Sequence, residues 1–294
     1  MKALILTNAY YAAEEYLYAP RRIRDELRAR GVEAEIAAND FFPYRLSDGG
    51  LKGGFGDVSF IIYYDKDKYV AGAAEKAGLR LYNRAEAIAL ADDKFSTLLC
   101  LADHGINLPR TLPGLLNYRE ETHVGEALLN RVESEFGYPV VVKECYGSLG
   151  RGVRLVKNRE ELKAAAESVR LKPHLFQEYV GARFGSDVRV MVAGGKAIGA
   201  VERRSPNDFR ANVSLGGSAR RFDADPETLR AAEHAASVMG LTFCGVDFLI
   251  SENGLILNEV NSNPFFGGFE KATGINAAGH IADAVLSAEN DRTF

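Results

Sequence analysis

The first 90 residues alternate between short apolar runs and amphipathic stretches. Three apolar runs have the length of buried strands, at Ala3–Leu6, Val32–Ala37 and Val58–Tyr64. Pro20 and Gly31 fit the first turn and the end of a helix between the first two runs. A second, alanine-rich helix is expected from about Tyr69 to Lys76. Strands that alternate with helices in this way predict a small parallel α/β layer over residues 1–90.

The pattern changes from about residue 91. The expected elements are, in order, a helix at Asp92–His104, a Pro109–Pro113 stretch, a helix ending near Phe136, strands at Tyr138–Lys143 and Val153–Val156, a helix at 158–170 and a strand at Leu175–Val180. Longer strands follow at Asp187–Val192, Ala197–Arg203, Phe243–Ile250 and Leu255–Val260, with helices at 226–239 and 274–288. Strands grouped like this predict antiparallel α+β units, which we divide into residues 91–180 and 181–294.

Composition narrows the class of protein. The 294 residues are 47% hydrophobic and 26% charged, and the formal net charge of -4 argues against a nucleic-acid partner. The three cysteines form no C-x-x-C pair, which argues against a zinc site or a disulfide framework. The apolar run at the N-terminus is too short for a signal sequence or a membrane span. We therefore expect a cytoplasmic protein without a membrane partner.

A lysine and a glycine-rich turn form the first candidate site. Lys143 ends the apolar run Val140–Lys143, and the sequence GSLGRG follows at Gly147–Gly152. Glycines allow backbone N–H groups to approach phosphate oxygens, and a fixed ammonium offsets phosphate charge. The order of these features matches neither a Walker A loop nor a protein kinase. A glycine-rich hairpin with a surface lysine is the alternative.

Two carboxylates interrupt the apolar strands of the last third. Asp247 and Glu259 lie in neighbouring strands of an expected hairpin, and Asn261 shares a sheet face with Glu259 because it is two residues further on. Three oxygen ligands on one face are suited to magnesium. The alternative is a pair of carboxylates at strand ends that nearby arginines hold.

Two weaker patterns lie between these sites. Arg203 is followed by Arg204, and then by Phe209-Arg210-Ala-Asn212. Arg210 and Asn212 are two residues apart and could reach phosphate oxygens, or the arginines could be a solvated cluster. The segment Phe176–Val180 has the character of a strand edge that could contact an adenine ring through its backbone. Asp187 could then accept the ribose hydroxyls.

Taken together, the order and spacing of these motifs resemble the ATP-grasp superfamily, and specifically the RimK-like carboxylate-amine (glutamate) ligases. The resemblance covers roughly residues 80–290. The matching elements are Asp93-Lys94, Pro109-x-Thr111, Lys143 with GSLGRGV, QEYV with Asp187 and Arg189, Arg203-Arg204 with FRAN and a glycine pair, GVDFL, and NEVNSNP. The resemblance implies an ATP-grasp fold, in which an N-terminal parallel layer precedes two α+β subdomains that clamp ATP.

The resemblance also implies a role for each matching residue. The nucleotide would contact Lys94, Lys143, Gly147, Ser148, Gly150, Gly152, Gln177, Glu178, Tyr179, Val180, Asp187, Arg210 and Asn212. Magnesium, or alternatively manganese, would be held by Asp247, Glu259 and Asn261. Arg203, with Arg210, would stabilise the charge that develops during the transfer steps.

The expected activity is an ATP-dependent ligation of a carboxylate to an amine through an acyl phosphate, with ADP and phosphate as products. The substrates would be small molecules or peptides, and a homo-oligomer is a family-level expectation. Two alternatives are a non-catalytic ATP-binding module of the same fold and an unrelated sugar-binding or structural α/β protein. The loops at Val213–Leu215 and Ser262–Phe266 depart from the family pattern, and we expect both to face the substrates. Phe265 and Phe266 would then offer an aromatic wall, unless both rings pack into the core.

Overall fold

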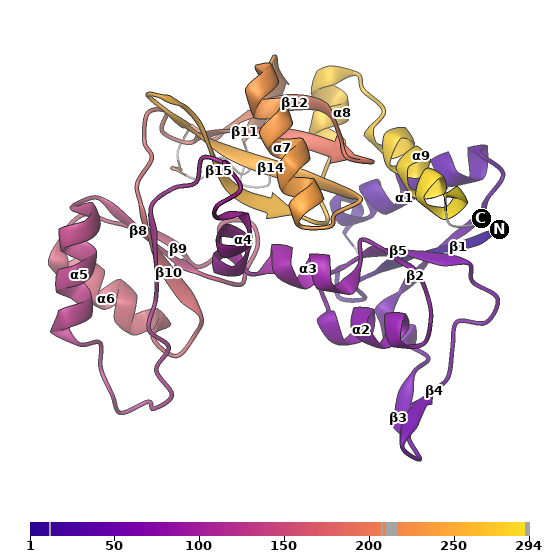
Figure 1. Ribbon diagram of the computed structural model, residues 1–294, viewed down its shortest axis with the longest axis horizontal. Coiled ribbons are helices and arrows are strands. Elements are labelled where there is room, and N and C mark those ends of the chain that lie inside the picture. The colour runs from indigo at the N-terminus through magenta and orange to yellow at the C-terminus, as the bar shows by residue number, and fades with distance from the viewer. Residues whose placement is uncertain (12, 207, 210–216, 292–294) are drawn as a thin grey trace.

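Three β-sheets, one from each third of the chain, surround a common centre (Figure 1). The computed structural model describes residues 1–294 except 12, 207, 210–216 and 292–294. Within that part of the chain, no helix is long and apolar enough to cross a membrane. The arrangement of one parallel sheet and two antiparallel sheets confirms the predicted fold class.

The N-terminal sheet is parallel, with strand order β2-β1-β5-β6. Its elements are β1 (Lys2–Thr7), α1 (Glu14–Ala29), β2 (Glu33–Ala38), the 3₁₀ turn η1 (Asn39–Phe41), β5 (Phe60–Tyr64), α2 (Lys68–Lys76), β6 (Leu81–Tyr82) and α3 (Ala85–Asp92). A short hairpin of β3 (Arg45–Ser47) and β4 (Gly50–Lys52) projects from it (Figure 1). The sequence did not indicate this hairpin, β6 or α3.

The position expected for Pro20 was wrong. Pro20 lies inside α1, which begins at Glu14, and not in its first turn. Glu14 and Glu15 occupy the first turn, where negative side chains interact favourably with the helix dipole. Pro20 is buried, so the burial of its ring outweighs the backbone hydrogen bond that proline cannot make.

The central sheet is antiparallel, with strand order β7-β10-β8-β9. Its elements are α4 (Lys94–Leu101), β7 (Thr111–Pro113), α5 (Glu126–Phe136), β8 (Val140–Glu144), β9 (Val153–Val156), α6 (Arg159–Val169) and β10 (His174–Glu178). The pairing of β8 with β9 confirms the predicted hairpin. The helix expected at Asp92–His104 is instead divided at Asp93, whose carboxylate caps α4 by accepting from two backbone N–H groups.

Period-two alternation directs one face of the central sheet toward the centre of the molecule. Val142 and Phe176 point to the side covered by α5 and α6 and belong to a fully buried cluster with Leu162. Lys143 and Gln177 are offset by one residue, so their side chains lie on the opposite face.

The C-terminal sheet is also antiparallel, with strand order β13-β12-β11-β14-β15. Its elements are β11 (Ser186–Ala193), β12 (Lys196–Arg204), β13 (Ser218–Phe222), α7 (Pro226–Val238), β14 (Phe243–Ser251), β15 (Gly254–Asn261), α8 (Gly267–Thr273) and α9 (Ala277–Asn290). The sequence did not indicate β13 or α8. Helix α7 covers one face of this sheet, whereas α9 packs beside α1 (Figure 1). The domain boundaries at 90/91 and 180/181 stay an interpretation.

The buried side chain of Asn83 is one of the groups that join the N-terminal and C-terminal sheets. Asn83 follows β6 and is completely buried. Its Oδ1 accepts from the backbone N of Thr242 at 2.8 Å and of Phe243 at 3.2 Å. Its Nδ2 donates to the carbonyl oxygens of Phe243 at 2.8 Å and Ser262 at 2.9 Å. Together with a hydrophobic core that both sheets share, this contact fixes the N-terminal layer against β14.

We expect Asn83→Ala to destabilise the protein by about 3 kcal/mol, because buried backbone groups around β14 lose their partners. The measurement is the shift of the urea midpoint relative to wild type, converted with the wild-type slope. Asn253→Ala, in an exposed turn, is the matched control and should leave the midpoint unchanged. Equal midpoints for the two variants would contradict this role of Asn83.

Candidate active site

A cavity of about 790 Å³ lies where the three sheets meet. Its lining includes most of the site residues indicated by the sequence, namely Lys94, Lys143, Gly147, Ser148, Gly150, Gln177, Glu178, Tyr179, Val180, Asp187, Arg203, Asp247, Glu259 and Asn261. Gly152 lies in the same loop but outside the lining. Arg210 and Asn212 lie outside the described residues. The structure thus brings together residues that are up to 167 positions apart, from Lys94 to Asn261.

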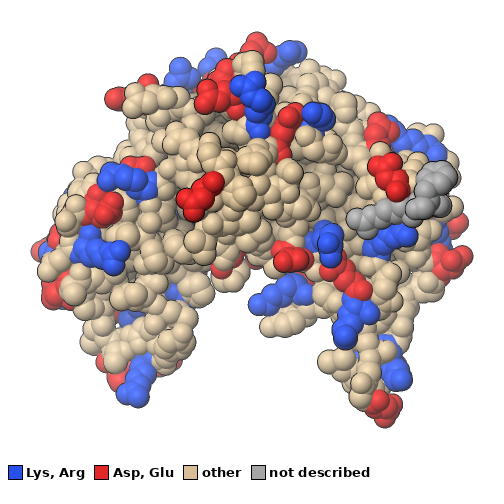
Figure 2. Space-filling view, viewed as in Figure 1, with Lys and Arg blue, Asp and Glu red and all other residues tan. Residues whose placement is uncertain are grey.

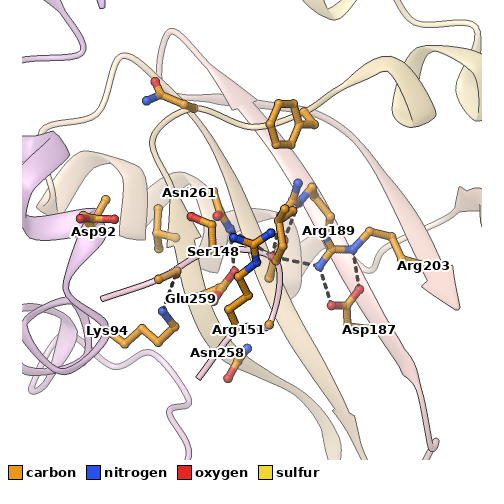
Figure 3. A pocket seen from close by; sticks show the side chains of 18 of the residues that line it. Asp92, Lys94, Ser148, Arg151, Asp187, Arg189, Arg203, Asn258, Glu259 and Asn261 are labelled. Carbon is orange, nitrogen blue, oxygen red and sulfur yellow. Dashed lines mark hydrogen bonds and ion pairs between the residues drawn. The ribbon is translucent and has the colours of Figure 1, made fainter. Parts of the chain in front are cut away.

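Two arginines and two aspartates form a buried network on the C-terminal sheet (Figure 3). Arg189 on β11 is directly opposite Asp247 on β14, and its Nε and Nη2 donate to the two carboxylate oxygens at 2.6 and 2.7 Å. Arg203 on β12 is opposite Asp187 and binds it through Nε at 2.7 Å. Nη2 of Arg203 also donates to Oδ2 of Asp247 at 2.9 Å. Strand register therefore creates the network, because each charged pair faces its partner across a ladder.

Burial and ion pairing shift the pKa values of the side chains in this network in opposite directions. Burial raises the pKa of Asp187, although Arg203 lowers it. Burial also acts to raise the pKa of Asp247, but Arg189 and Arg203 together hold that pKa below its usual range. Burial would lower the pKa of Arg203, but Asp247 and Asp187 raise it, so this guanidinium stays charged.

Both oxygens of Asp187 accept from Arg203, which shows Asp187 holding that arginine in place. The ribose contact expected for Asp187 stays a prediction.

Hydrogen bonds link the expected metal ligands to this network, and Figure 3 shows Glu259 and Asn261 beside it. Nδ2 of Asn261 donates to Asp247 and to Glu259, at 3.1 Å in both cases. Asp247 is almost completely buried and shared with two arginines, whereas Glu259 is partly exposed to the cavity. Carboxylate and amide oxygens are the donors that hard divalent cations prefer, so this set fits magnesium, with Glu259 as its most accessible member.

Three lysines from two layers surround the glycine-rich turn. Nζ of Lys94 donates to the carbonyl oxygen of Gly147 at 2.8 Å. Nζ of Lys143 donates to Gln177 at 2.6 Å and to Asn258 at 2.9 Å. Lys66, which follows β5, donates to Ser148 at 3.3 Å and pairs with Asp92 at 2.8 Å. The turn therefore contacts both the central and the N-terminal layers.

Glycine is required in this turn for two reasons. Gly147 has φ of +134°, which side-chain-bearing residues rarely adopt. Gly152 has φ of +72°, and a Cβ there would lie 3.0 Å from the side chain of Glu144. The turn therefore keeps its backbone close to the cavity, as a phosphate-binding loop needs.

The far end of the cavity is formed by β10 and the segment that follows it. Both carboxylate oxygens of Glu178 accept from Arg110, through the backbone N at 2.9 Å and Nε at 2.8 Å. Nε2 of Gln177 donates to Thr111 at 2.9 Å. Tyr179 and Val180 line the cavity just beyond the strand end, at the place where the sequence predicts the adenine contact.

Comparisons with known proteins agree with this geometry. The family model described as the RimK-like ATP-grasp domain matches residues 91–285. The chain belongs to the RimK-like ATP-grasp family. It is 37% identical over 214 residues to a probable alpha-L-glutamate ligase of Maridesulfovibrio salexigens. The aligned residues cover 72% of this chain and 68% of that protein. It is also 37% identical over 228 residues to the beta-citrylglutamate synthase B of Danio rerio, which covers 76% of this chain and 54% of that protein.

The fold comparison extends over the whole chain. A crystal structure of a RimK domain ATP-grasp protein from Sphaerobacter thermophilus has a TM-score of 0.74 at 24% identity and covers 97% of this chain and 99% of that one. This similarity includes the N-terminal layer, which the family match does not reach. The family and the ATP-grasp fold expected from the sequence are thereby confirmed. The chain spans about half the length of the Danio rerio relative, so its own activity is a matter for proposal.

The sequence assigned no role to several residues that line this ATP-grasp cavity. Arg189 was visible in the Asp187-Val-Arg189 motif, and its position opposite Asp247 could not be known without the register. Asn258 was missed because strict alternation places it on the face opposite Glu259. An irregularity in the pairing of β14 with β15, next to Asp247, allows both consecutive residues to line the cavity.

The two phenylalanines of the expected aromatic wall differ in their exposure to solvent. Phe266 is completely buried in the core shared by the N-terminal and C-terminal sheets, so it does not offer an open surface to a substrate. Phe265 is 42% exposed, and its ring meets that of Tyr16 edge to face at 5.2 Å. Both residues border the cavity, but of the two rings only that of Phe265 is exposed.

We expect the ATP affinity of this ATP-grasp protein to fall above about pH 8. Burial is the main effect that lowers the pKa of Lys143 to about 8, and the charge of Lys94 lowers it further while Glu259 raises it. The ammonium is lost as the pH rises through that value, and affinity should weaken by up to about tenfold per pH unit. Calorimetric titration with magnesium–ATP between pH 6.5 and 9.5 measures the effect.

Lys143→Arg is the control for this pH dependence, because arginine stays charged over the whole range. Its affinity should change little between the two ends of the range. A wild-type profile that coincides with that of Lys143→Arg would contradict a phosphate contact by Lys143.

Proposed function

We propose that this protein is an ATP- and magnesium-dependent carboxylate–amine ligase that acts through an acyl phosphate. The proposal is supported by three groups that line one cavity. They are Arg203, which is charged and bound to two aspartates, two lysines suited to phosphates, and the oxygen atoms of the expected metal ligands. The substrates would be a small-molecule or peptide carboxylate and an amine.

The first step transfers the γ-phosphoryl group. A carboxylate oxygen attacks the γ-phosphorus, the bond to the β-phosphate oxygen breaks, and ADP leaves. Lys94, Lys143 and the turn at Gly147–Gly152 would hold the phosphates, since ammonium groups and backbone N–H groups offset their charge. Glu259, Asn261 and Asp247 would hold magnesium, which when bound neutralises phosphate charge.

The second step forms the amide. The amine must first lose the proton of its ammonium form, and its nitrogen then attacks the carbonyl carbon of the acyl phosphate. Inorganic phosphate leaves with its bridging oxygen, and the nitrogen loses a second proton to solvent. Negative charge develops on the carbonyl oxygen, and Arg203 lines the cavity with its guanidinium kept charged by Asp187 and Asp247. A positioned cation of this kind stabilises the tetrahedral intermediate.

A non-catalytic ATP-binding module is the competing function. Such a module needs the lysines and the glycine-rich turn, but it has no use for a buried arginine that two aspartates hold beside an oxygen ligand set. The cost of burying four charged side chains favours a role for them in chemistry. The face shown in Figure 2 indicates no other charged binding surface, because acidic and basic side chains are interspersed there.

The test is hydroxamate formation. With magnesium–ATP, hydroxylamine and pools of carboxylic acids, wild type should release ADP and form a hydroxamate from the correct acid. Glu259→Gln keeps the size of the side chain and should lower the rate by about 100-fold or more, because it removes the accessible charged ligand. Glu252→Gln, in the exposed turn between β14 and β15, should retain the wild-type rate.

Two results would overturn the proposal. AMP as the nucleotide product would place the attack at the α-phosphorus and exclude an acyl phosphate. Wild-type turnover by Glu259→Gln would remove the assigned ligand set.

A further inference from the structure

The end of the cavity that the N-terminal layer forms has no role in the nucleotide assignment. It is lined by residues after the carboxyl ends of β1 and β5, by the first turns of α1, and by Phe265. The carboxyl edge of a parallel sheet is a common place for ligands in α/β folds, because loops there diverge and leave a crevice. This end is therefore available to an organic substrate.

A buried carboxylate without a cation lies at this edge. Asp65 directly follows β5 and is 8% exposed. Its oxygens accept from the side-chain amides of Asn8 at 3.1 Å and Asn39 at 2.7 Å, and no lysine or arginine of the described residues pairs with it. The neighbouring Lys66 pairs with Asp92 instead. A buried carboxylate that has only neutral partners is costly, so a cationic ligand would stabilise it.

A second acceptor lies beside Asp65. Nδ2 of Asn263 donates to the backbone oxygen of Asp65 at 2.7 Å, which places the two residues in contact. The Oδ1 of Asn263 is buried and has no hydrogen-bond partner among the described residues. Asn263 lies two residues beyond Asn261, so this acceptor is close in the chain to the expected metal ligands. An acceptor without a donor, beside a carboxylate that has only neutral donors, indicates a ligand that supplies N–H groups.

Aromatic rings form the adjoining wall. The rings of Tyr11 and Tyr16 stack at 5.0 Å, and the ring of Tyr16 meets Phe265 edge to face at 5.2 Å. Tyr11 and Phe265 are both substantially exposed, although aromatic residues of this size are usually covered. This surface suits a flat apolar group and would also attract a positive charge.

We propose that this end of the cavity binds the amine substrate, and that this substrate carries an aromatic or similar apolar group and not an acidic one. The inference rests on the proposed ligase function. The amino group donates to Asp65 and to Oδ1 of Asn263, and the apolar group lies against Tyr16 and Phe265. Two cations of the described lining residues lie near this end, and both are paired: Lys66 with Asp92 and Arg189 with Asp247. Among the residues that the structure describes, an acidic side chain would therefore find no free cationic partner at this end.

The test is calorimetric binding to the full chain in the presence of magnesium and a non-hydrolysable ATP analogue. Tyramine is the aromatic amine probe, 3-(4-hydroxyphenyl)propionate keeps the ring without the amine, and L-glutamate represents an acidic amine. Tyramine should bind at least about tenfold more tightly than either of the others, the difference expected for a charge-assisted hydrogen bond. Glutamate binding as tightly as tyramine would overturn the proposal.

Variants separate the two parts of the proposed subsite. Asp65→Asn and Phe265→Ala should each weaken tyramine binding about tenfold, while the affinity for the ATP analogue stays at the wild-type value. Tyr118→Ala, which removes an exposed ring outside the cavity, should bind tyramine like wild type. Thermal melting checks the fold of each variant, and Phe265→Ala carries the test if Asp65→Asn misfolds. Unchanged tyramine affinity in the folded variants would contradict the assignment.

Binding is read here without turnover, so this inference and the proposed function fail separately. Hydroxamate formation together with a preference for glutamate as the amine would leave the ligase proposal intact and overturn the subsite. Tight tyramine binding without any ATP-dependent product would overturn the ligase proposal and support an amine site.

Discussion

The pairing of Arg203 and Arg189 with Asp187 and Asp247 sets the position of almost every group in the cavity. These four side chains are buried on one face of the C-terminal sheet, where an unpaired charge would be strongly destabilising. Each pair must therefore stay in register, and that requirement fixes β11, β12 and β14 relative to one another. Asn261 and Glu259 are linked to the same network by hydrogen bonds. The buried charges therefore help to fix the position of the accessible Glu259 carboxylate.

The other layers meet this network through a few polar contacts. Asn83 joins the end of β6 to β14, and the hydroxyl of Tyr64 donates to the carbonyl oxygen of Pro264 at 2.5 Å. Lys143 reaches from the central sheet to Asn258. The phosphate-binding lysines, the charged network and the edge that holds Asp65 consequently face one cavity. An enzyme that joins two substrates at the expense of ATP needs such a meeting point, because all three reactants must be held together.

Local sequence patterns were sufficient to predict elements with strong periodicity. They were insufficient where tertiary contacts determine the position or exposure of a residue. The β8–β9 hairpin and the antiparallel C-terminal sheet follow from apolar runs and glycines. Pro20 was misplaced because its burial within α1 outweighs the usual preference of proline for the first turn. Asn258 and Phe266 show the limit for the site. A pairing irregularity lets Asn258 line the cavity together with Glu259, and Phe266 is buried whereas its neighbour Phe265 is exposed. Asp65 could not be found from the sequence, since the lack of a cation near a carboxylate is a property of the folded chain.

The proposed ligase function requires that one nucleotide bridges the central and C-terminal sheets in this cavity. The most direct measurement is a crystal structure of the protein with magnesium and a non-hydrolysable ATP analogue. We expect the triphosphate to lie between Lys143 and Glu259, with its terminal phosphate within reach of Arg203 and its adenine beside Tyr179 and Val180. A nucleotide bound outside the cavity, or one whose phosphates contact neither Lys94 nor Lys143, would contradict the account.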